Sequence, residues 1–221
     1  MTTRESVIFD LDGTLIESEQ IWADVREHFV TGHGGRWRDD AQKKMIGMST
    51  TEWSRYVHDD LGVALPLRRI ARDVIAAMVD RLSRDVPVLP GADAVLARLG
   101  AEFLLGLATS APVALAQTVL AKTGWRRYFA VVVSSEEVAR GKPAPDVYLR
   151  ALDLLKADPA RTAAIEDSTN GILSADAAKL AVIAVPNRAY PPDTNALARA
   201  TRVVGSLDKV DVALIRAAIL D

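Results

Sequence analysis

The stretch Phe9-Asp10-Leu11-Asp12-Gly13-Thr14-Leu15 decides the fold of this chain, because it places two carboxylates at the end of a short apolar strand. The residues Ser6 to Phe9 are β-formers, and Gly13 provides the break that ends the strand. Residues two apart in a strand point the same way, so Asp10 and Asp12 start towards one side. One carboxylate can attack phosphorus while the other handles the proton, and two crowded anions imply a metal cation.

The composition is that of a globular protein able to bury a sizeable core. The chain has 221 residues, of which 49% are hydrophobic and 25% charged, and it contains no cysteine. Its formal net charge is -2, from 27 basic and 29 acidic residues, which argues against nucleic acid or a membrane surface as the main partner. With no apolar leader and no run of about 20 apolar residues, we expect a cytoplasmic protein.

After residue 100, short apolar runs alternate with helical patterns, which is typical of parallel strands joined by crossover helices. This alternation predicts an α/β fold with a doubly wound parallel sheet. We expect strands at 7–10, 103–108, 130–134, 162–165, 181–185 and 202–204. We expect helices at 112–122, 145–156, 170–178 and 211–219.

Residues 16–88 interrupt this alternation and show only helical patterns. Apolar residues recur at helical spacing from Ile21 to Phe29 and again from Leu67 to Leu82. Glycine-containing joints at 31–35 and at Gly47 separate three or four helices. We therefore predict a core domain formed by 1–15 and 89–221, with an inserted all-helical cap domain over 16–88.

Polar residues follow the expected strands at the edge where an open α/β sheet gathers its ligands. Thr109 and Ser110 follow the strand at 103–108 and offer hydroxyl and backbone N–H groups to a phosphate oxygen. Lys142 can neutralise charge on a nucleophile and a phosphoryl group. Glu166 and Asp167 offer the hard oxygen ligands that suit Mg²⁺. Each site alone has an ordinary structural explanation, such as a turn or a helix cap, but all four in order indicate an active site.

This arrangement resembles the haloacid dehalogenase-like superfamily of phosphotransferases over essentially the whole chain. The four motifs of that superfamily correspond to Asp10-Leu11-Asp12-Gly13-Thr14, Thr109, Lys142 and Glu166-Asp167, and the helical insertion lies where the cap of subfamily I belongs. The segments 10–22, 141–149 and 166–171 look like the branch of bacterial sugar-phosphate phosphatases and β-phosphoglucomutases.

The resemblance implies a role for each motif residue. Asp10 would be the nucleophile that forms an aspartyl-phosphate, and Asp12 the general acid and base. Thr109 and Lys142 would complete the catalytic set by holding phosphoryl oxygens. Magnesium would be held by Asp10, by the backbone carbonyl of Asp12 and by Asp167, with Glu166 supporting it directly or through water.

Residues of the helical insertion distinguish a phosphatase from a mutase. In the mutase branch a cap His follows the nucleophile by about three helical turns, and an Arg in a later cap loop grips a second phosphate. Here Trp22 and Thr50 hold these places, which favours water as the acceptor. Trp22 is expected either in the core of the cap or over the substrate. We assign recognition of the leaving group to the loop 45–51, through Gly47, Ser49 and Thr50.

The predicted function is magnesium-dependent hydrolysis of a small phosphomonoester, a sugar or polyol phosphate, through an aspartyl-phosphate. A β-phosphoglucomutase-like mutase is the alternative that shares all four motifs. A dehalogenase would need no second aspartate, so Asp12 argues against it. A receiver-like phospho-acceptor domain is the non-enzymatic alternative, but it would lack the Asp-x-Asp pair and have no use for a helical lid. The expected partner is a small phosphorylated metabolite, and the expected state is a monomer.

Overall fold

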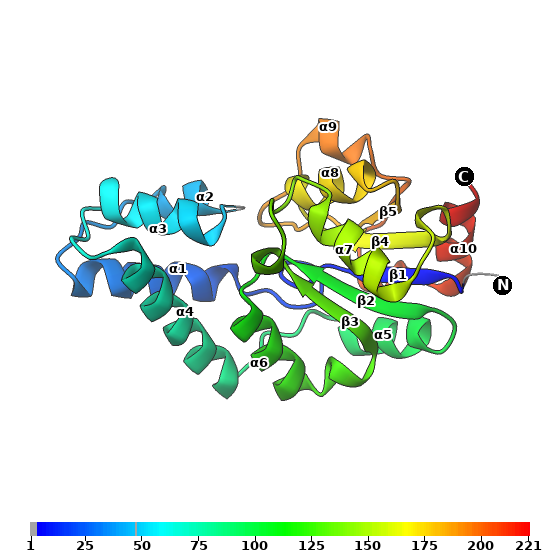
Figure 1. Ribbon diagram of the computed structural model, residues 1–221, viewed down its shortest axis with the longest axis horizontal. Coiled ribbons are helices and arrows are strands. Elements are labelled where there is room, and N and C mark those ends of the chain that lie inside the picture. The colour runs from blue at the N-terminus through cyan, green and yellow to red at the C-terminus, as the bar shows by residue number, and fades with distance from the viewer. Residues whose placement is uncertain (1–3, 47) are drawn as a thin grey trace.

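The computed structural model of this protein describes residues 4–46 and 48–221, and these residues contain a single parallel sheet (Figure 1). The strand order is β3-β2-β1-β4-β5-β6, which confirms the doubly wound topology. Each expected strand is present, with its ends within one residue of the prediction. The strands are β1 (Ser6–Phe9), β2 (Leu104–Thr109), β3 (Phe129–Ser134), β4 (Thr162–Glu166), β5 (Ala181–Ala184) and β6 (Arg202–Val203).

The expected crossover helices correspond to α6, α7, α8 and α10. The shorter α9 and the 3-10 turns were not predicted, because three or four residues carry no helical periodicity. The α-helices are α1 (Glu19–Gly32), α2 (Ala41–Met45), α3 (Thr50–Asp59), α4 (Leu67–Arg84), α5 (Ala92–Gly100), α6 (Val113–Thr123), α7 (Asp146–Leu155), α8 (Thr169–Ala177), α9 (Thr194–Leu197) and α10 (Val212–Leu220). The 3-10 turns are η1 (Trp125–Arg127), η2 (Ser135–Glu137), η3 (Pro159–Arg161) and η4 (Leu207–Lys209).

Helices cover both faces of the sheet, as a parallel sheet requires. On the central strand β1, Val7 and Phe9 belong to one buried cluster and Ile8 to another. The first cluster contains apolar residues of α5, α6 and α10, and the second contains those of α7, α8 and α9. Alternate side chains of β1 are therefore buried on opposite faces, and the strand is fixed in the middle of the core.

Helices α1 to α4 follow β1 in the chain and lie beyond the end of the sheet to which the carboxyl end of β1 points (Figure 1). Their packed faces are apolar and include Trp22, Trp53, Val74 and Met78, all buried. Helix α4 packs against α1 and α3, and also against α6 of the sheet layer. The division into domains at 15/16 and 88/89 stays a prediction.

The segments that lead into and out of these helices are hydrogen-bonded to one another. Ile16 and Val88 form an isolated antiparallel bridge. On either side of it, the N–H of Glu17 donates to the carbonyl of Pro87 and the N–H of Leu89 donates to that of Leu15, both over 2.9 Å. A bridge of one residue pair leaves no pattern in the sequence, so the pairing of these two segments could be seen only in the structure.

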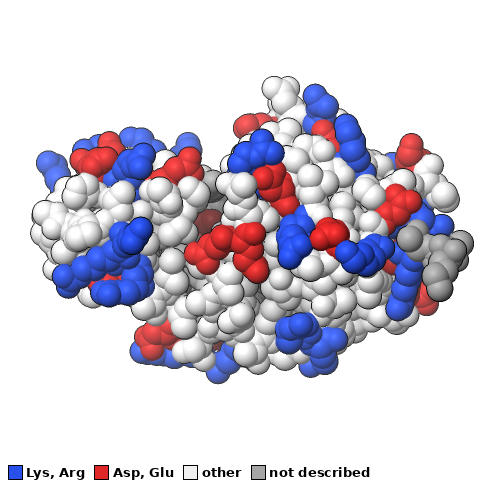
Figure 2. All heavy atoms as spheres, viewed as in Figure 1, with Lys and Arg blue, Asp and Glu red and all other residues white. Residues whose placement is uncertain are grey.

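Charged side chains of both signs are interspersed on the face drawn in Figure 2. This distribution agrees with the near-balanced composition. Among the helices that the structure describes, none combines the length and the apolar character that a bilayer crossing requires.

Candidate active site

The register of the sheet brings the predicted motif residues to one edge. Phe9 of β1 pairs with Leu107 of β2 and with Ile165 of β4, so Asp10 lies beside the carboxyl ends of both neighbouring strands, which end at Thr109 and Glu166. The N–H of Asp10 donates to the carbonyl of Ile165 over 3.0 Å. The strand order reverses on either side of β1, which is where open α/β sheets bind their ligands.

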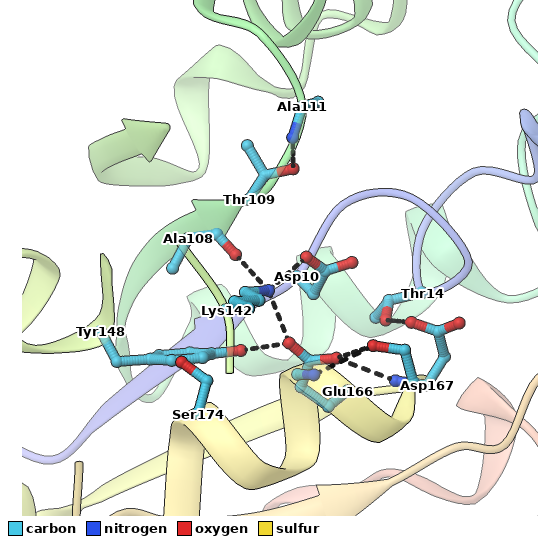
Figure 3. A network of polar contacts seen from close by, with 12 residues as sticks. Asp10, Thr14, Ala108, Thr109, Ala111, Lys142, Tyr148, Glu166, Asp167 and Ser174 are labelled. Atoms are coloured by element: carbon cyan, nitrogen blue, oxygen red, sulfur yellow. Dashed lines mark hydrogen bonds and ion pairs between the residues drawn. The ribbon is translucent and has the colours of Figure 1, made fainter. Parts of the chain in front are cut away.

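Lys142 lies at the centre of a buried polar network (Figure 3). Its Nζ is 2.6 Å from Oδ1 of Asp10, 2.6 Å from Oε1 of Glu166 and 3.0 Å from the carbonyl oxygen of Ala108, so all three of its N–H donors have acceptors. Burial alone would lower the pKa of Lys142, but the charges and hydrogen bonds of Asp10 and Glu166 outweigh burial and raise it above its ordinary value. The ammonium therefore stays charged beside the proposed nucleophile.

Glu166 is fully buried, and both of its carboxylate oxygens accept hydrogen bonds from other residues of the protein. Its Oε1 also accepts from the Tyr148 hydroxyl over 2.6 Å, and its Oε2 accepts from the Ser168 hydroxyl over 3.4 Å. Burial, and then the charge of Glu166, raise the pKa of Tyr148 well above its usual value, so the hydroxyl keeps its proton and donates. Gly171 makes room for this carboxylate, because a Cβ there would lie 1.8 Å from Oε2. Glu166 thus holds Lys142 in place.

Asp10, Glu166 and Asp167 form an acidic cluster whose donor set suits a divalent cation. Each offers a carboxylate oxygen, and these atoms lie within 4.8 Å of one another. Burial raises the pKa of Asp10 to about 7 although Lys142 opposes the shift, and burial together with the neighbouring carboxylates raises that of Asp167 well above its ordinary value. A cation such as Mg²⁺, which prefers oxygen ligands, would offset this crowding of negative charge.

Gly13 and Thr14 place Asp167 in that cluster. Gly13 has a φ of +88°, and a Cβ at this position would lie 2.1 Å from Oδ2 of Asp167. The Thr14 hydroxyl donates to Oδ1 of Asp167 over 3.3 Å. The turn after β1 therefore requires glycine both for its left-handed backbone and for the close approach of the carboxylate.

The side chain of Asp12 lies outside the three-carboxylate cluster and is held by residues at the start of α1. The Ser18 N–H donates to Oδ1 over 3.1 Å, and the Ser18 hydroxyl donates to Oδ2 over 2.5 Å. The indole Nε1 of Trp22 donates to Oδ2 over 3.3 Å. Burial raises the pKa of Asp12, while the hydrogen bonds from Ser18 and Trp22 oppose the shift. This position suits a residue whose implied metal contact is its backbone carbonyl.

A cavity of about 570 Å³ lies between this edge of the sheet and the helices α1 to α3. It brings together most of the residues that the sequence predicted. The predicted residues that line it are Asp10, Asp12, Trp22, Thr50, Thr109, Ser110, Lys142 and Asp167. Trp22 is buried in the packing of these helices: it is 6% exposed and its ring centroid lies 6.2 Å from that of Trp53. It also forms part of the cavity wall, and its expected role over the substrate stays a prediction.

Two predicted residues are placed differently from the others. Glu166 is buried and does not belong to the cavity lining. Ser49 is not among the lining residues either, since its hydroxyl accepts from the N–H of Glu52 and caps α3 in a capping box. Gly47 lies outside the described residues. Thr109 lines the cavity, and its hydroxyl accepts from the N–H of Ala111 over 3.0 Å in the turn after β2. It does not cap α6, whose N-cap residue is Pro112.

Several cavity residues were missed by reasoning from sequence. Glu19 and Arg26 of α1 line the cavity, and Gln42 of α2 connects them. A signal for Arg26 was present, because it shares the buried face of α1 with Trp22 and Phe29, where a charge is unexpected. The loop after β5 has an irregular conformation without a sequence signature. Its residues that line the cavity are Asn187, Ala189, Tyr190 and Pro191.

Comparison with known proteins identifies the class that this fold and site define. The sequence matches the family described as haloacid dehalogenase-like hydrolase over residues 7–185, so the chain belongs to that family. The match spans all four motifs and the helical insertion. Membership of a hydrolase family sets aside the receiver-like alternative.

Two relatives named as phosphatases and one solved structure illustrate the similarity. The chain is 31% identical over 206 residues to a bifunctional riboflavin kinase/FMN phosphatase of Arabidopsis thaliana, covering 91% of this chain but only 53% of the relative. It is 28% identical over 200 residues to hexitol phosphatase B of Escherichia coli K12, covering 82% of this chain and 83% of the relative. Among solved structures, CbbY of Rhodobacter sphaeroides in complex with phosphate superimposes with a TM-score of 0.87 at 25% identity, covering 96% and 99% of the two chains.

Proposed function

We propose that this protein is a magnesium-dependent phosphatase that hydrolyses a small phosphomonoester, a sugar or polyol phosphate, through an aspartyl-phosphate. The observation that carries the proposal is the buried contact of Lys142 with Asp10 beside Asp167, at the wall of a cavity that also holds Asp12. The relatives named as FMN phosphatase and hexitol phosphatase support the reaction and a substrate of this size.

The proposed reaction has two steps. In the first, a carboxylate oxygen of Asp10 attacks phosphorus, the bond to the leaving oxygen breaks, and Asp12 gives that oxygen a proton. In the second, Asp12 takes a proton from water, whose oxygen attacks phosphorus and releases inorganic phosphate from Asp10. Because Lys142 occupies Oδ1 of Asp10, Oδ2 is the oxygen that we assign to the attack.

We assign the metal to Asp10, Asp167 and the backbone carbonyl of Asp12. A bound Mg²⁺ would neutralise charge on the phosphoryl oxygens. We give Glu166 the indirect role among the two that were expected, because Lys142 and Tyr148 already occupy its Oε1. Thr109, Ser110 and Lys142 would hold the remaining phosphoryl oxygens. The monomeric state and the cytoplasmic location stay predictions.

Water is the acceptor that we favour over a second hydroxyl. Trp22 and Thr50 line the cavity where the mutase branch has a cap His and an Arg. Trp22 donates a hydrogen bond to Asp12 but has no basic atom that could exchange protons with a sugar hydroxyl. The mutase reaction remains the second candidate, because the core motifs fit it equally well.

The experiment is phosphate release from an aryl phosphate and from a panel of hexose and polyol phosphates, with Mg²⁺. We expect turnover by the wild type and only the background rate for Asp10→Asn, while Asp39→Asn, an exposed position, serves as the matched control. A wild type that is inert across the panel overturns the phosphatase, and isomerisation of a hexose phosphate without phosphate release establishes the mutase instead.

A further inference from the structure

Arg26 of α1 is a buried cation in the wall of the cavity that contains Asp10. Arg26 is 5% exposed, and its Nη1 donates to Oε1 of Gln42 over 3.1 Å. Its guanidinium carbon lies 4.4 Å from the ring centroid of Trp22 and 5.1 Å from that of Trp53. Within residues 4–46 and 48–221, its Nε has no hydrogen-bond partner and it forms no ion pair within 4.0 Å.

A buried guanidinium in such surroundings is an incomplete arrangement. Buried charges are normally paired with an opposite charge, since desolvation is costly otherwise. The faces of Trp22 and Trp53 attract the cation but do not accept its N–H groups in the plane of the guanidinium. Burial lowers the pKa of Arg26 only to about 10, so the side chain is charged at neutral pH.

Glu19 acts on Arg26 without forming an ion pair with it. The Gln42 amide stands between them, with its Nε2 donating to Oε2 of Glu19 over 2.7 Å and its Oε1 accepting from Arg26. Burial, and then the charge of Asp12, raise the pKa of Glu19 to about 7, so its negative charge is incomplete at neutral pH. Arg26 therefore feels the charges of Glu19 and Asp12 but has no direct ion-pair partner among the described residues.

The position of Arg26 relative to Asp12 fixes which part of a substrate it would meet. Trp22 contacts Asp12, the residue assigned to protonate the leaving oxygen, and Arg26 follows Trp22 by one helical turn, or about 6 Å along α1. A phosphoryl group at Asp10 would place the leaving oxygen near Asp12. The far end of a leaving group a few carbon atoms long would then reach Arg26.

We propose that Arg26 binds a second oxyanion, a carboxylate or a phosphate, at the far end of the leaving group, and so selects doubly anionic substrates. This inference rests on the proposed phosphatase function and narrows its substrate class. Lys43, exposed on α2, is the other cation that the cap helices add to the described cavity lining, and its place on the surface makes it an auxiliary to Arg26. Thr50, at the position of the mutase arginine, carries no charge that could serve instead.

A matched set of three-carbon phosphomonoesters tests the proposal. The neutral member is 3-hydroxypropyl phosphate, and the charged members are 3-(phosphonooxy)propanoate and propane-1,3-diyl bisphosphate. With Mg²⁺, the wild type should show a kcat/KM at least tenfold higher for one or both charged members, and the better of the two identifies the oxyanion as carboxylate or phosphate. Equal values for all three, or hydrolysis of an aryl phosphate with none of the three, overturn the inference and leave the phosphatase standing. Failure on every phosphomonoester overturns both.

Variants then assign the selectivity to Arg26. Arg26→Met should lower the ratio of charged to neutral kcat/KM at least tenfold, mainly by raising KM for the charged substrate, and Arg26→Lys should retain part of the ratio. Arg38→Met is the matched control, because Arg38 is an exposed arginine that donates to the carbonyl of Asp60. A wild-type ratio in folded Arg26→Met overturns the assignment. If Arg26→Met does not fold, Arg26→Lys and Arg26→Gln take its place. A ratio of charged to neutral kcat/KM that is unchanged in both variants overturns the assignment, and so does a wild type without a tenfold preference.

Discussion

The indole Nε1 of Trp22 donates to Oδ2 of Asp12 over 3.3 Å, so helix α1 is bonded directly to the proposed general acid and base. Ser18, which precedes the same helix, supplies two further hydrogen bonds to this carboxylate. The orientation of Asp12 is thereby set by the helices that cover the site as well as by β1. Movement of α1 relative to the sheet would change the position of the proton donor together with the size of the cavity.

Replacing Trp22 by Phe removes the N–H donor and keeps most of the packing against Trp53. A hydrogen bond of this kind contributes about 0.5–1.5 kcal/mol. We expect kcat to fall about two- to tenfold and thermal stability to fall as well, because the indole is buried against Trp53. Steady-state kinetics on an aryl phosphate measure the effect. Trp37→Phe, at a half-buried position of the cap without a bond to Asp12, is the control, and equal kcat values for the two variants would contradict the coupling.

Gly171→Ala tests the space that Glu166 needs. The added methyl would lie 1.8 Å from Oε2 of Glu166, and a displaced Glu166 would release Lys142. We expect a loss of about 1–3 kcal/mol of unfolding free energy together with a large fall in kcat. Gly205→Ala has no atom within 4 Å of the new Cβ and should leave both quantities near the wild-type values. Denaturant unfolding and turnover assays report the two effects.

Magnesium should stabilise the folded protein, because it binds the carboxylate cluster only when the chain is folded. At a concentration one hundred times its Kd the expected gain is about 2.7 kcal/mol, which raises Tm by several degrees in a chain of this length. Asp167→Asn should lose this response while starting from a Tm at or above that of the metal-free wild type, since one crowded anion is gone. Calorimetry with and without EDTA decides, and an Asp167→Asn protein that responds like Asp39→Asn would refute the assignment.

Glu19→Gln should change how stability depends on pH. Burial first, and then the charges of Asp12 and Glu17, raise the pKa of Glu19 to about 7, against the opposing effects of Arg26 and Gln42. The stability contributed by such a raised pKa is fully present below the unfolded value of about 4.5 and is lost as the pH rises through about 7. The variant should therefore gain Tm relative to the wild type at pH 8 and not at pH 4.5.

Thermal unfolding at several pH values between 4.5 and 8 measures this difference. Glu27→Gln, at an exposed position of the same helix, is the matched control. The same Tm difference between Glu19→Gln and wild type at both ends of the range would show that Glu19 titrates as it does in the unfolded chain.

The sheet and the core motifs could be predicted because their signals are local. Asp10, Thr109 and Glu166 each end an apolar run, and parallel strands of an α/β sheet present these ends at one edge, so adjacency in space followed from position in the chain. The contact of Lys142 with Asp10 was expected because its ammonium could neutralise charge on the nucleophile, although 132 residues separate the two.

The partners of these residues could not be predicted, because they come from faces whose neighbours are decided by packing. Tyr148 reads as an ordinary apolar position of α7, and only the fold shows its hydroxyl on Glu166. Gln42 and Glu19 come from different helices of the cap, and their bond depends on the angle between those helices. Ser49 illustrates the opposite case: a polar loop residue that suggested substrate contact serves the local backbone of α3.

The bridge between Ile16 and Val88 holds together the two ends of the helical segment that lies between them in the chain. A segment with its two ends fixed together can be exchanged for another of different length or sequence without altering the register of β1 with β2 and β4. Replacing residues 17–87 by the corresponding helices of a relative would then transplant the recognition of the leaving group onto an unchanged set of Asp10, Thr109, Lys142 and Asp167. Because Ser18 and Trp22 lie within the exchanged segment and hold Asp12, such an exchange would also change the hydrogen bonds that orient the proposed acid and base.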